Sequence, residues 1–332
     1  MKYIKTISFG FLLTLLMIVD VQSQSLTVYS GRSKALVEPL IEEFEQETGI
    51  RMNVRYGSST QLAVALMEEG RRTPADVFWA QDAGALGAVH QAGLLQPLPP
   101  SSVADIPSEY RNAAGTWVAT SGRARVLAYS SHRVDKERLP ESVYDLVQPE
   151  WAGRVGWAPA NGSFQSFLTS MRLLDGNEKT LEWLENMKNN NARSYINNSA
   201  LLQAISAGEI DLALTNHYYL YRFKENNPDY PVAQIFFKAG DPGNLINVAG
   251  LGILASSQKT TEAEAFIHFL LKPENQQWVA DEIFEYPVHP DIRTWSSGRE
   301  LEHIQDLAPS VDLDDLSSLE QTLTLLRRAG LL

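Results

Sequence analysis

The chain has 332 residues, of which 44% are hydrophobic and 20% charged, a composition typical of a globular protein with room for two domains. It carries 40 acidic residues against 28 lysines and arginines, a formal charge of −12, and this acidity argues against nucleic acid as a partner, which requires a basic surface. There is no cysteine, which excludes structural disulfides, thiolate metal sites and cysteine nucleophiles.

The first residues have the pattern of a secretory signal peptide. Lys2 and Lys5 form a short basic region, residues 7–19 are apolar and uncharged, and tolerated cleavage residues follow up to Ser23. The apolar run is shorter than a membrane span, and an uncleaved anchor is the alternative. We therefore expect residues 1–23 to be removed, with cleavage near Ser23, and the mature chain to be free in the bacterial periplasm.

Short strands and helices alternate through the first part of the mature chain. Strands are predicted at 26–29, 51–56 and 74–79, and helices at 35–48, at 83–91, and from a cap at Ser59 or Thr60 to about 69. This alternation is typical of an α/β lobe with a mostly parallel sheet, which binds ligands at the carboxyl ends of its strands. Those ends carry polar residues at 30–33, 57–60 and 81–82.

Residues 117–130 form a longer predicted strand that contains Arg123 and Arg125. Because they are two residues apart, the arginines share one face of this strand, and Gly122 allows a ligand to approach closely. Two guanidiniums aimed the same way can hold a small oxyanion through paired hydrogen bonds. The alternative is a solvated strand face, or salt bridges to the acidic surface.

A second α/β lobe is predicted beyond this strand. Its strands lie at 153–157, 210–215 and 232–237, and its helices at 164–174, 181–188 and 200–207. The loop Asn161-Gly162-Ser163 precedes a helix, so it offers backbone N–H groups and a hydroxyl to an anion. An apolar run at 247–254 can return the chain to the first lobe, where helices at 262–271 and 274–283 follow.

Residues 208–226 hold the most distinctive motif. A strand at 210–215 leads into a helix with Asn216 as its N-cap, and Tyr218 and Tyr219 occupy the first turn. At ~3.6 residues per turn the two phenols are about 100° apart and can both lean into a cleft, whereas neighbours on a strand point to opposite faces. A phenolate pair beside the anion-binding helix start suits a hard cation such as Fe(III). The alternative is that both tyrosines are packing aromatics.

No enzyme motif is present: the sequence has no Walker A loop, G-x-S-x-G elbow, H-E-x-x-H pair or dinucleotide fingerprint. Polar groups at strand ends and helix starts, in two α/β lobes of an exported chain, instead indicate a solute-binding protein that closes on its ligand by a hinge motion. We therefore expect a binding protein and not an enzyme.

The sequence resembles the periplasmic ferric-iron-binding proteins of ABC transporters over nearly all of the mature chain. The joint order and spacing of six segments carry the similarity: 28–31 (VYSG), 74–78 (PADVF), 121–126 (SGRARV), 161–164 (NGSF), 197–199 (NNS) and 216–219 (NHYY). The fold this implies is a two-lobed periplasmic-binding-protein fold, each lobe a mostly parallel sheet flanked by helices, joined by a strand hinge. The expected organisation is lobe 1 at 24–120 plus 249–300, lobe 2 at 121–248, and a helical tail at 301–332 docking on a lobe.

The resemblance also implies a site. It places Fe(III) on Tyr218 and Tyr219 as phenolates, completed by a synergistic anion such as carbonate or phosphate. The implied anion contacts are Arg123, Arg125, Asn161, Gly162, Ser163, Asn198 and Asn216, with Asp82 as a further candidate. The cargo would pass to an inner-membrane ABC permease, and we expect the carrier to be a monomer.

Three positions depart from the family pattern. The loop after the first strand reads Arg32-Ser33-Lys34, where some relatives have a histidine; Gln81 stands where some have a glutamate, and Phe164 where some have a tyrosine. Two protein ligands remain, so either anion and water complete the metal shell or the cargo is a ferric chelate or another small organic solute, such as a polyamine or thiamine. An exported α/β hydrolase is the remaining alternative.

Overall fold

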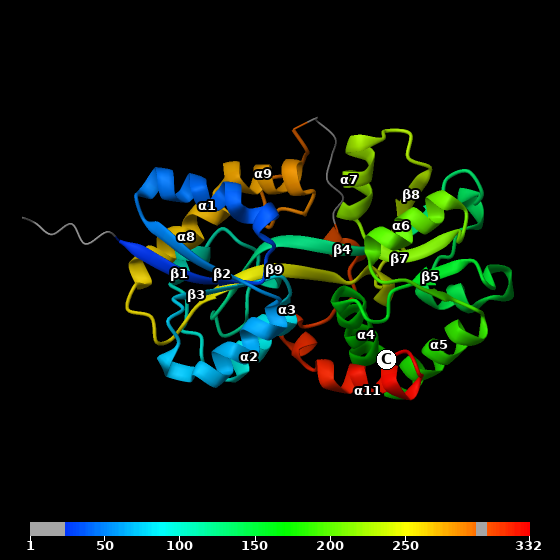
Figure 1. Ribbon diagram of the computed structural model, residues 1–332, viewed down its shortest axis with the longest axis horizontal. Coiled ribbons are helices and arrows are strands. Elements are labelled where there is room, and N and C mark those ends of the chain that lie inside the picture. Colours follow the sequence, from blue (N-terminus) through cyan, green and yellow to red (C-terminus); the bar gives the residue numbers. More distant parts are fainter. Residues whose placement is uncertain (1–23, 297–303) are drawn as a thin grey trace, which may run out of the picture.

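The structure is a computed structural model that describes residues 24–296 and 304–332 (Figure 1). Two α/β bodies lie side by side, and the strands β4 (Val118–Ser130) and β9 (Ile246–Ile253) run between them. The two-lobed α/β fold predicted from the sequence is confirmed. The expected signal peptide lies outside the described residues, as does the expected start of the tail at residue 301.

The first body is built on three parallel strands, with β1 (Ser25–Ser30) between β2 (Arg51–Tyr56) and β3 (Val77–Ala80). One side carries α1 (Lys34–Thr48), α8 (Thr260–Leu271) and α9 (Pro273–Ile283), and the other carries α2 (Ser59–Glu69) and α3 (Ala83–Gln91) (Figure 1). The helix α1 forms because its apolar residues recur at helical spacing, and those from Val37 to Phe44 are buried. It ends at Gly49, whose φ of 72° is a left-handed conformation that suits glycine.

The second body contains the strands β5 (Val155–Trp157), β6 (Arg193–Ser194), β7 (Leu212–Asn216) and β8 (Val232–Ile235). Its helices are α4 (Gly162–Asp175), α5 (Asn177–Asn189), α6 (Asn198–Ala207) and α7 (Tyr218–Asn226). The order of the strands and helices follows the sequence prediction. The exception is β6, a two-residue exposed strand that was not predicted because it has no apolar pattern.

The strands of the described chain form one nine-stranded sheet, in the order β2-β1-β3-β9-β4-β7-β5-β6, with β8 paired to β4. The first half of β4 is antiparallel to β9, and its second half is antiparallel to β7 and β8. A Cβ added at Gly250 would lie 2.6 Å from the backbone oxygen of Val118, so the close approach of β9 to β4 requires glycine there. This strand pair crosses between the bodies and is placed to act as their hinge.

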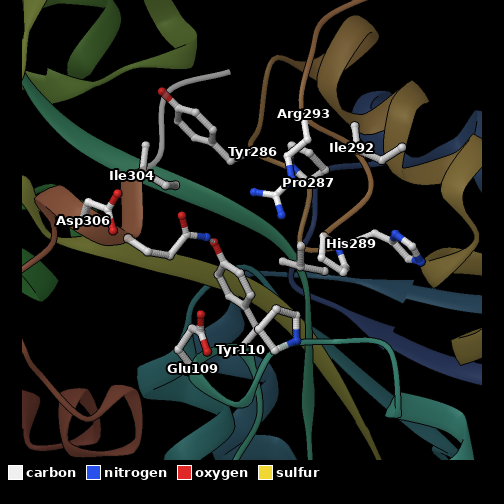
Figure 2. Close-up of a pocket in the computed structure, with 13 residues that line it drawn as sticks. Glu109, Tyr110, Tyr286, Pro287, His289, Ile292, Arg293, Ile304 and Asp306 are labelled. Atoms are coloured by element: carbon white, nitrogen blue, oxygen red, sulfur yellow. Dashed lines mark hydrogen bonds between the residues drawn. The ribbon is translucent and has the colours of Figure 1, made fainter. Parts of the chain in front are cut away.

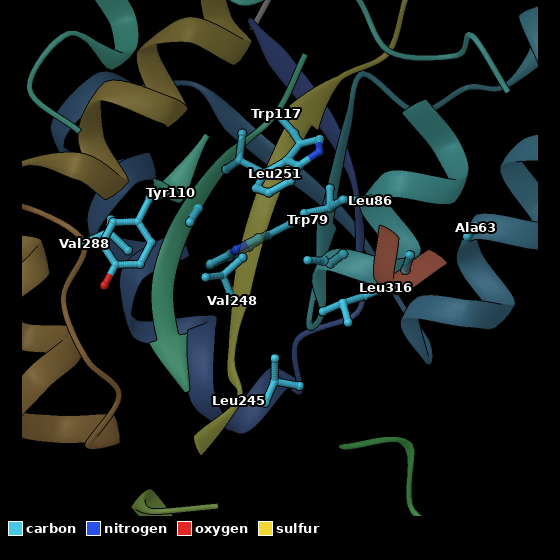
Figure 3. Packing of buried hydrophobic residues seen from close by; sticks show 14 of the residues in the cluster. Ala63, Trp79, Leu86, Tyr110, Trp117, Leu245, Val248, Leu251, Val288 and Leu316 are labelled. Atoms are coloured by element: carbon cyan, nitrogen blue, oxygen red, sulfur yellow. The ribbon is translucent and has the colours of Figure 1, made fainter. Parts of the chain in front are cut away.

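The main hydrophobic core covers both sides of this sheet (Figure 3). Figure 3 shows Trp79 of β3, Leu251 of β9 and Leu86 of α3 packed together, with Leu316 from the C-terminal region beside them. Trp117 is also fully buried and donates its indole N–H to Asp314 at 2.8 Å. Residues from the end of the chain therefore help to close the core of the first body.

The C-terminal tail contacts both bodies. The 3₁₀ turn η8 (Leu313–Ser317) packs on α3, and the helix α11 (Leu319–Arg328) packs on α4 and α5. Arg172 of α4 donates to the side chain of Gln321 at 2.7 Å. The helix α11 is amphipathic, and Thr322, Leu325 and Leu326 form its buried face. Within the described ranges, no helix combines the length and the apolar character needed to cross a bilayer.

Candidate metal centre

The two tyrosines stand at the junction between β7 and α7. The strand β7 is buried throughout and ends at Asn216. His217 follows the strand, and α7 begins at Tyr218. The prediction that Asn216 caps this helix is wrong. Asn216 is the last residue of β7, paired with Arg125 of β4, and its side-chain oxygen accepts from the Arg125 guanidinium at 3.3 Å. The strand β7 thus extends one residue further than the sequence pattern indicated. The Asn216 side chain, which was expected to cap the helix, instead bonds to Arg125.

Tyr218 and Tyr219 lie side by side, as the helix geometry predicted. Their rings are stacked, with centroids 4.4 Å apart and an interplanar angle of 27°. Tyr218 is 5% exposed, and both residues line a cavity of about 350 Å³. Burial, with the neighbouring Tyr219 phenol as a second cause, raises the pKa of Tyr218 well above its ordinary value. Without a cation the Tyr218 phenol is therefore protonated at neutral pH.

The cavity lies between the two bodies, because its lining comes from both. Gly31, Ser33, Leu36 and Gln81 belong to the first body; Arg123 belongs to β4; Asn161, Ser163, Asn198, Tyr218, Tyr219 and Arg222 belong to the second body. Of the predicted site residues, six line the cavity: Arg123, Asn161, Ser163, Asn198, Tyr218 and Tyr219. The structure thus gathers residues from four predicted motifs around one space.

The two arginines of β4 have different positions. Arg123 lines the cavity and donates to the backbone oxygen of Gln81. Arg125 is not among the lining residues: it is buried against the rings of Phe164 and Phe167, at 5.4 and 5.5 Å, and donates to Ser163 at 3.1 Å. Burial lowers the pKa of Arg125 to about 9, which leaves the guanidinium charged at neutral pH. Arg125 is therefore placed to hold Ser163 from behind the cavity wall.

Three helices begin beside the cavity. Asn161 caps α4, since its side-chain oxygen accepts from the backbone N–H of Ser163 at 3.1 Å and from the hydroxyl of Ser163 at 2.6 Å. Asn198 is the first residue of α6 and donates to the Ser163 hydroxyl at 3.3 Å. Gly162 is the exposed first residue of α4 and does not line the cavity. Helix starts carry partial positive charge and free N–H groups, so this wall of the cavity favours an anion.

The structure shows the surroundings of two positions that departed from the family pattern, Phe164 and Gln81, and of the further anion candidate Asp82. Phe164 is fully buried in a cluster of aromatic rings with Trp157 and Trp183, and it does not reach the cavity. Gln81 lines the cavity, and its side-chain oxygen accepts from Arg32 at 2.8 Å. Asp82 caps α3 by accepting from the backbone N–H of Ala85, and it is not among the lining residues.

Two features of the site were missed from the sequence. Arg222 lines the cavity, four residues after Tyr218 on α7, and this helical spacing was a usable signal. Glu285 is fully buried and accepts from Arg32 at 3.0 and 2.9 Å. Burial alone would raise the pKa of Glu285, but the charges of Arg32 and Arg123 lower it overall. No local pattern could have found this pair, because its members are 253 residues apart.

A second cavity, of about 240 Å³, contains none of the predicted site residues. Figure 2 shows Tyr110 and Arg293 turned towards its interior, with Tyr286 and His289 nearby. The Tyr110 hydroxyl accepts from the side-chain amide of Gln305. In residues 24–296 and 304–332, no group of three or more His, Asp or Glu side chains is placed to hold a metal ion. Within the described ranges, the phenol pair lies beside helix starts whose N–H groups favour an anion.

The chain is similar in sequence and fold to known binding proteins. Residues 72–302 match the family described as "Bacterial extracellular solute-binding protein". The chain is 35% identical over 311 residues to the "Major ferric iron-binding protein" of Neisseria meningitidis serogroup A, covering 92% of this chain and 93% of the relative. It is 32% identical over 315 residues to the "Fe(3+)-binding periplasmic protein" of Serratia marcescens, covering 93% and 91%. The crystal structure of iron-bound HitA from Pseudomonas aeruginosa superposes with a TM-score of 0.84 at 33% identity, covering 92% of this chain and 99% of that one.

Proposed function

The chain belongs to the bacterial extracellular solute-binding protein family, and from this premise we propose that it is the substrate-binding component of an ABC importer for ferric iron. The names of its relatives from Neisseria and Serratia support iron as the cargo and the periplasm as the compartment. The family is one of transport proteins, and the proposed role requires no catalysis. The protein would work as a monomer that closes its two bodies on the cargo and delivers it to an inner-membrane permease.

The metal is proposed to bind the phenolate oxygens of Tyr218 and Tyr219. The observation that carries this proposal is the stacked phenol pair in a cavity between two bodies. Oxygen donors suit a hard trivalent ion. Because the pKa of Tyr218 is raised, its proton leaves only when the charge of the metal displaces it. Binding is then coupled to proton release, so acid favours loss of the iron.

The anion, carbonate or phosphate or a similar ion, is proposed to lie between Arg123 and the helix starts of the second body. Arg123, Asn161, Ser163 and Asn198 line the cavity and are placed for direct contact. Gly162 lies in the first turn of α4. Arg125 donates to both Ser163 and Asn216, and these bonds keep the Ser163 hydroxyl in position. An anion there would complete the metal shell that two protein ligands leave open.

The chemistry of the cavity does not favour a cationic organic solute. A polyamine or a thiamine-like cation would be held by carboxylates, and the cavity lining contains arginines and no aspartate or glutamate. An organic anion that arrives as a ferric chelate remains compatible with the same residues. A hydrolase would have to show turnover, which the proposed carrier should not.

A ferric titration of the apo-protein tests the proposal. Added ferric citrate should produce a visible tyrosinate-to-iron charge-transfer band, and Tyr218→Phe and Tyr219→Phe should each weaken or abolish it. Tyr230→Phe is a matched control, because the Tyr230 hydroxyl donates to Leu202 at 2.9 Å and lies outside the cavity lining. The proposal is wrong if the wild-type protein gives no band, or if the band survives in both cavity variants.

A further inference from the structure

Arg222 is a cavity-lining cation that contacts the Tyr218 ring and has no ion-pair partner among the described residues. It lies one turn after Tyr218 on α7, with its guanidinium carbon 5.1 Å from the centroid of the Tyr218 ring. Its Nη2 atom is buried and makes no hydrogen bond within the described residues. A guanidinium that lies over an aromatic ring keeps its N–H edge free to donate. The site thus contains a buried donor atom that no group of the described residues uses.

Arg32, a buried arginine near the cavity, has a different environment. Arg32 is neutralised by Glu285 and also donates to Gln81. Arg222 has no carboxylate within ion-pair distance in the part of the chain that the structure describes, and the cavity lining contributes none. A buried donor atom is costly without an acceptor, so the unpaired Nη2 of the partly buried Arg222 indicates that the ligand brings a negative oxygen to it.

The net positive charge around the proposed metal indicates how many negative charges the anion should carry. A ferric ion bound to two phenolates retains one positive charge, the cavity-lining guanidiniums of Arg123 and Arg222 add two, and Arg125 behind the cavity wall adds a further one. Arg123 already donates to Gln81, so Arg222 is the freer of the two. A monovalent anion leaves most of this charge uncompensated, whereas an oxyanion with two or three charges can contact the metal and both arginines.

We propose that Arg222 selects polyvalent oxyanions as the partners of the ferric ion, by donating to a negative group that does not bind the metal. This inference rests on the proposed function, because it assumes iron at Tyr218 and Tyr219. Phosphate and a tricarboxylate such as citrate share the required chemistry, whereas a monocarboxylate such as acetate carries only one charge. Arg222 contacts the accompanying anion and leaves metal ligation to the phenols.

The test loads the apo-protein with ferric chloride in buffers that contain acetate, phosphate or citrate as the added oxyanion. Iron dissociation constants are measured by chelator competition, and the charge-transfer band is recorded in each buffer. Arg222→Gln should weaken binding about tenfold or more with phosphate or citrate, the equivalent of one charge-assisted hydrogen bond, and much less with acetate. Arg222→Lys should recover part of this loss. Lys224→Gln removes the same charge from α7 outside the cavity lining and should change each constant less than twofold.

The outcomes separate the two proposals. A wild-type protein that shows no charge-transfer band with any of these anions would overturn the proposed function itself. The role of Arg222 alone would be overturned by two results together. The wild-type band would depend on Tyr218 and Tyr219, and Arg222→Gln would leave the order of the iron dissociation constants in the three anion buffers unchanged. If Arg222→Gln weakens binding equally with all three anions, or if Lys224→Gln has the same effect, the selective contact is also refuted.

Discussion

Replacing Glu285 with glutamine should be among the most destabilising single changes near the cavity. Glu285 is 0% exposed and Arg32 is 2% exposed, and two hydrogen bonds of 3.0 and 2.9 Å join them. The Ser121 hydroxyl donates a third bond to the carboxylate. Glutamine keeps the shape but removes the charge, so Arg32 stays buried and uncompensated.

The expected loss is about 3 kcal/mol of unfolding free energy. Breaking a buried ion pair by removing one partner costs about 3–5 kcal/mol, and the lower end applies because Arg32 keeps Gln81 as an acceptor at 2.8 Å. Urea denaturation at pH 7 measures this loss as a shift of the midpoint. The double variant Arg32→Met, Glu285→Leu should recover much of the stability, since no charge is then left buried. A loss below about 1 kcal/mol, or a double variant no more stable than Glu285→Gln, would refute the reasoning.

The ion pair of Arg32 and Glu285 also predicts that the free energy of unfolding depends on pH. The folded-state pKa of Glu285 is lowered from an ordinary value of 4.5, so the unfolded chain binds the proton more readily. The stabilisation is therefore present above pH 4.5 and is lost as the pH falls through the folded-state pKa. The unfolding free energy of the wild-type protein should fall as the pH decreases over this range. In Glu285→Gln, the part of this decrease that comes from Glu285 should be absent. Equal slopes in the two proteins would contradict the assignment.

Three further predictions concern the cargo, the hinge and the tail. At fixed free Fe(III), the iron affinity should fall about 100-fold per unit decrease in pH, because two phenols each lose a proton on binding; a tenfold change in competition titrations would indicate one phenolate. Gly250→Ala should lower the unfolding free energy by about 1–3 kcal/mol, since its Cβ would lie 2.6 Å from the oxygen of Val118, and an unchanged urea midpoint would contradict this. Leu326→Ala should cost about 2–5 kcal/mol, because Leu326 is 0% exposed, whereas Leu332→Ala at a 49% exposed position should cost less than about 0.5 kcal/mol.

Local patterns in the sequence determined most of the secondary structure. The strand at 51–56 and the helix at 83–91 were predicted with the bounds that the structure gives them. Alternating apolar residues, helical spacing and glycine stops lie within a few residues of one another, so their effect can be read without knowing the fold. The adjacency of Tyr218 and Tyr219 is local in the same sense, because the first turn of one helix sets it.

Only the tertiary structure decided how the other site residues are used. Asn216 was expected to cap a helix, but pairing with β4 keeps it in the strand and gives its side chain to Arg125. Arg123 and Arg125 look equivalent along the strand, yet only Arg123 lines the cavity.

The ion pair of Arg32 and Glu285 shows the same limit most clearly. Its members meet because segments 253 residues apart pack together and exclude water. Whether a polar side chain faces a ligand, a buried partner or solvent depends on such contacts, since burial fixes the cost of leaving the group unpaired. The sequence by itself determined which residues could do the chemistry, and the packing of distant segments decided which of them face the cavity.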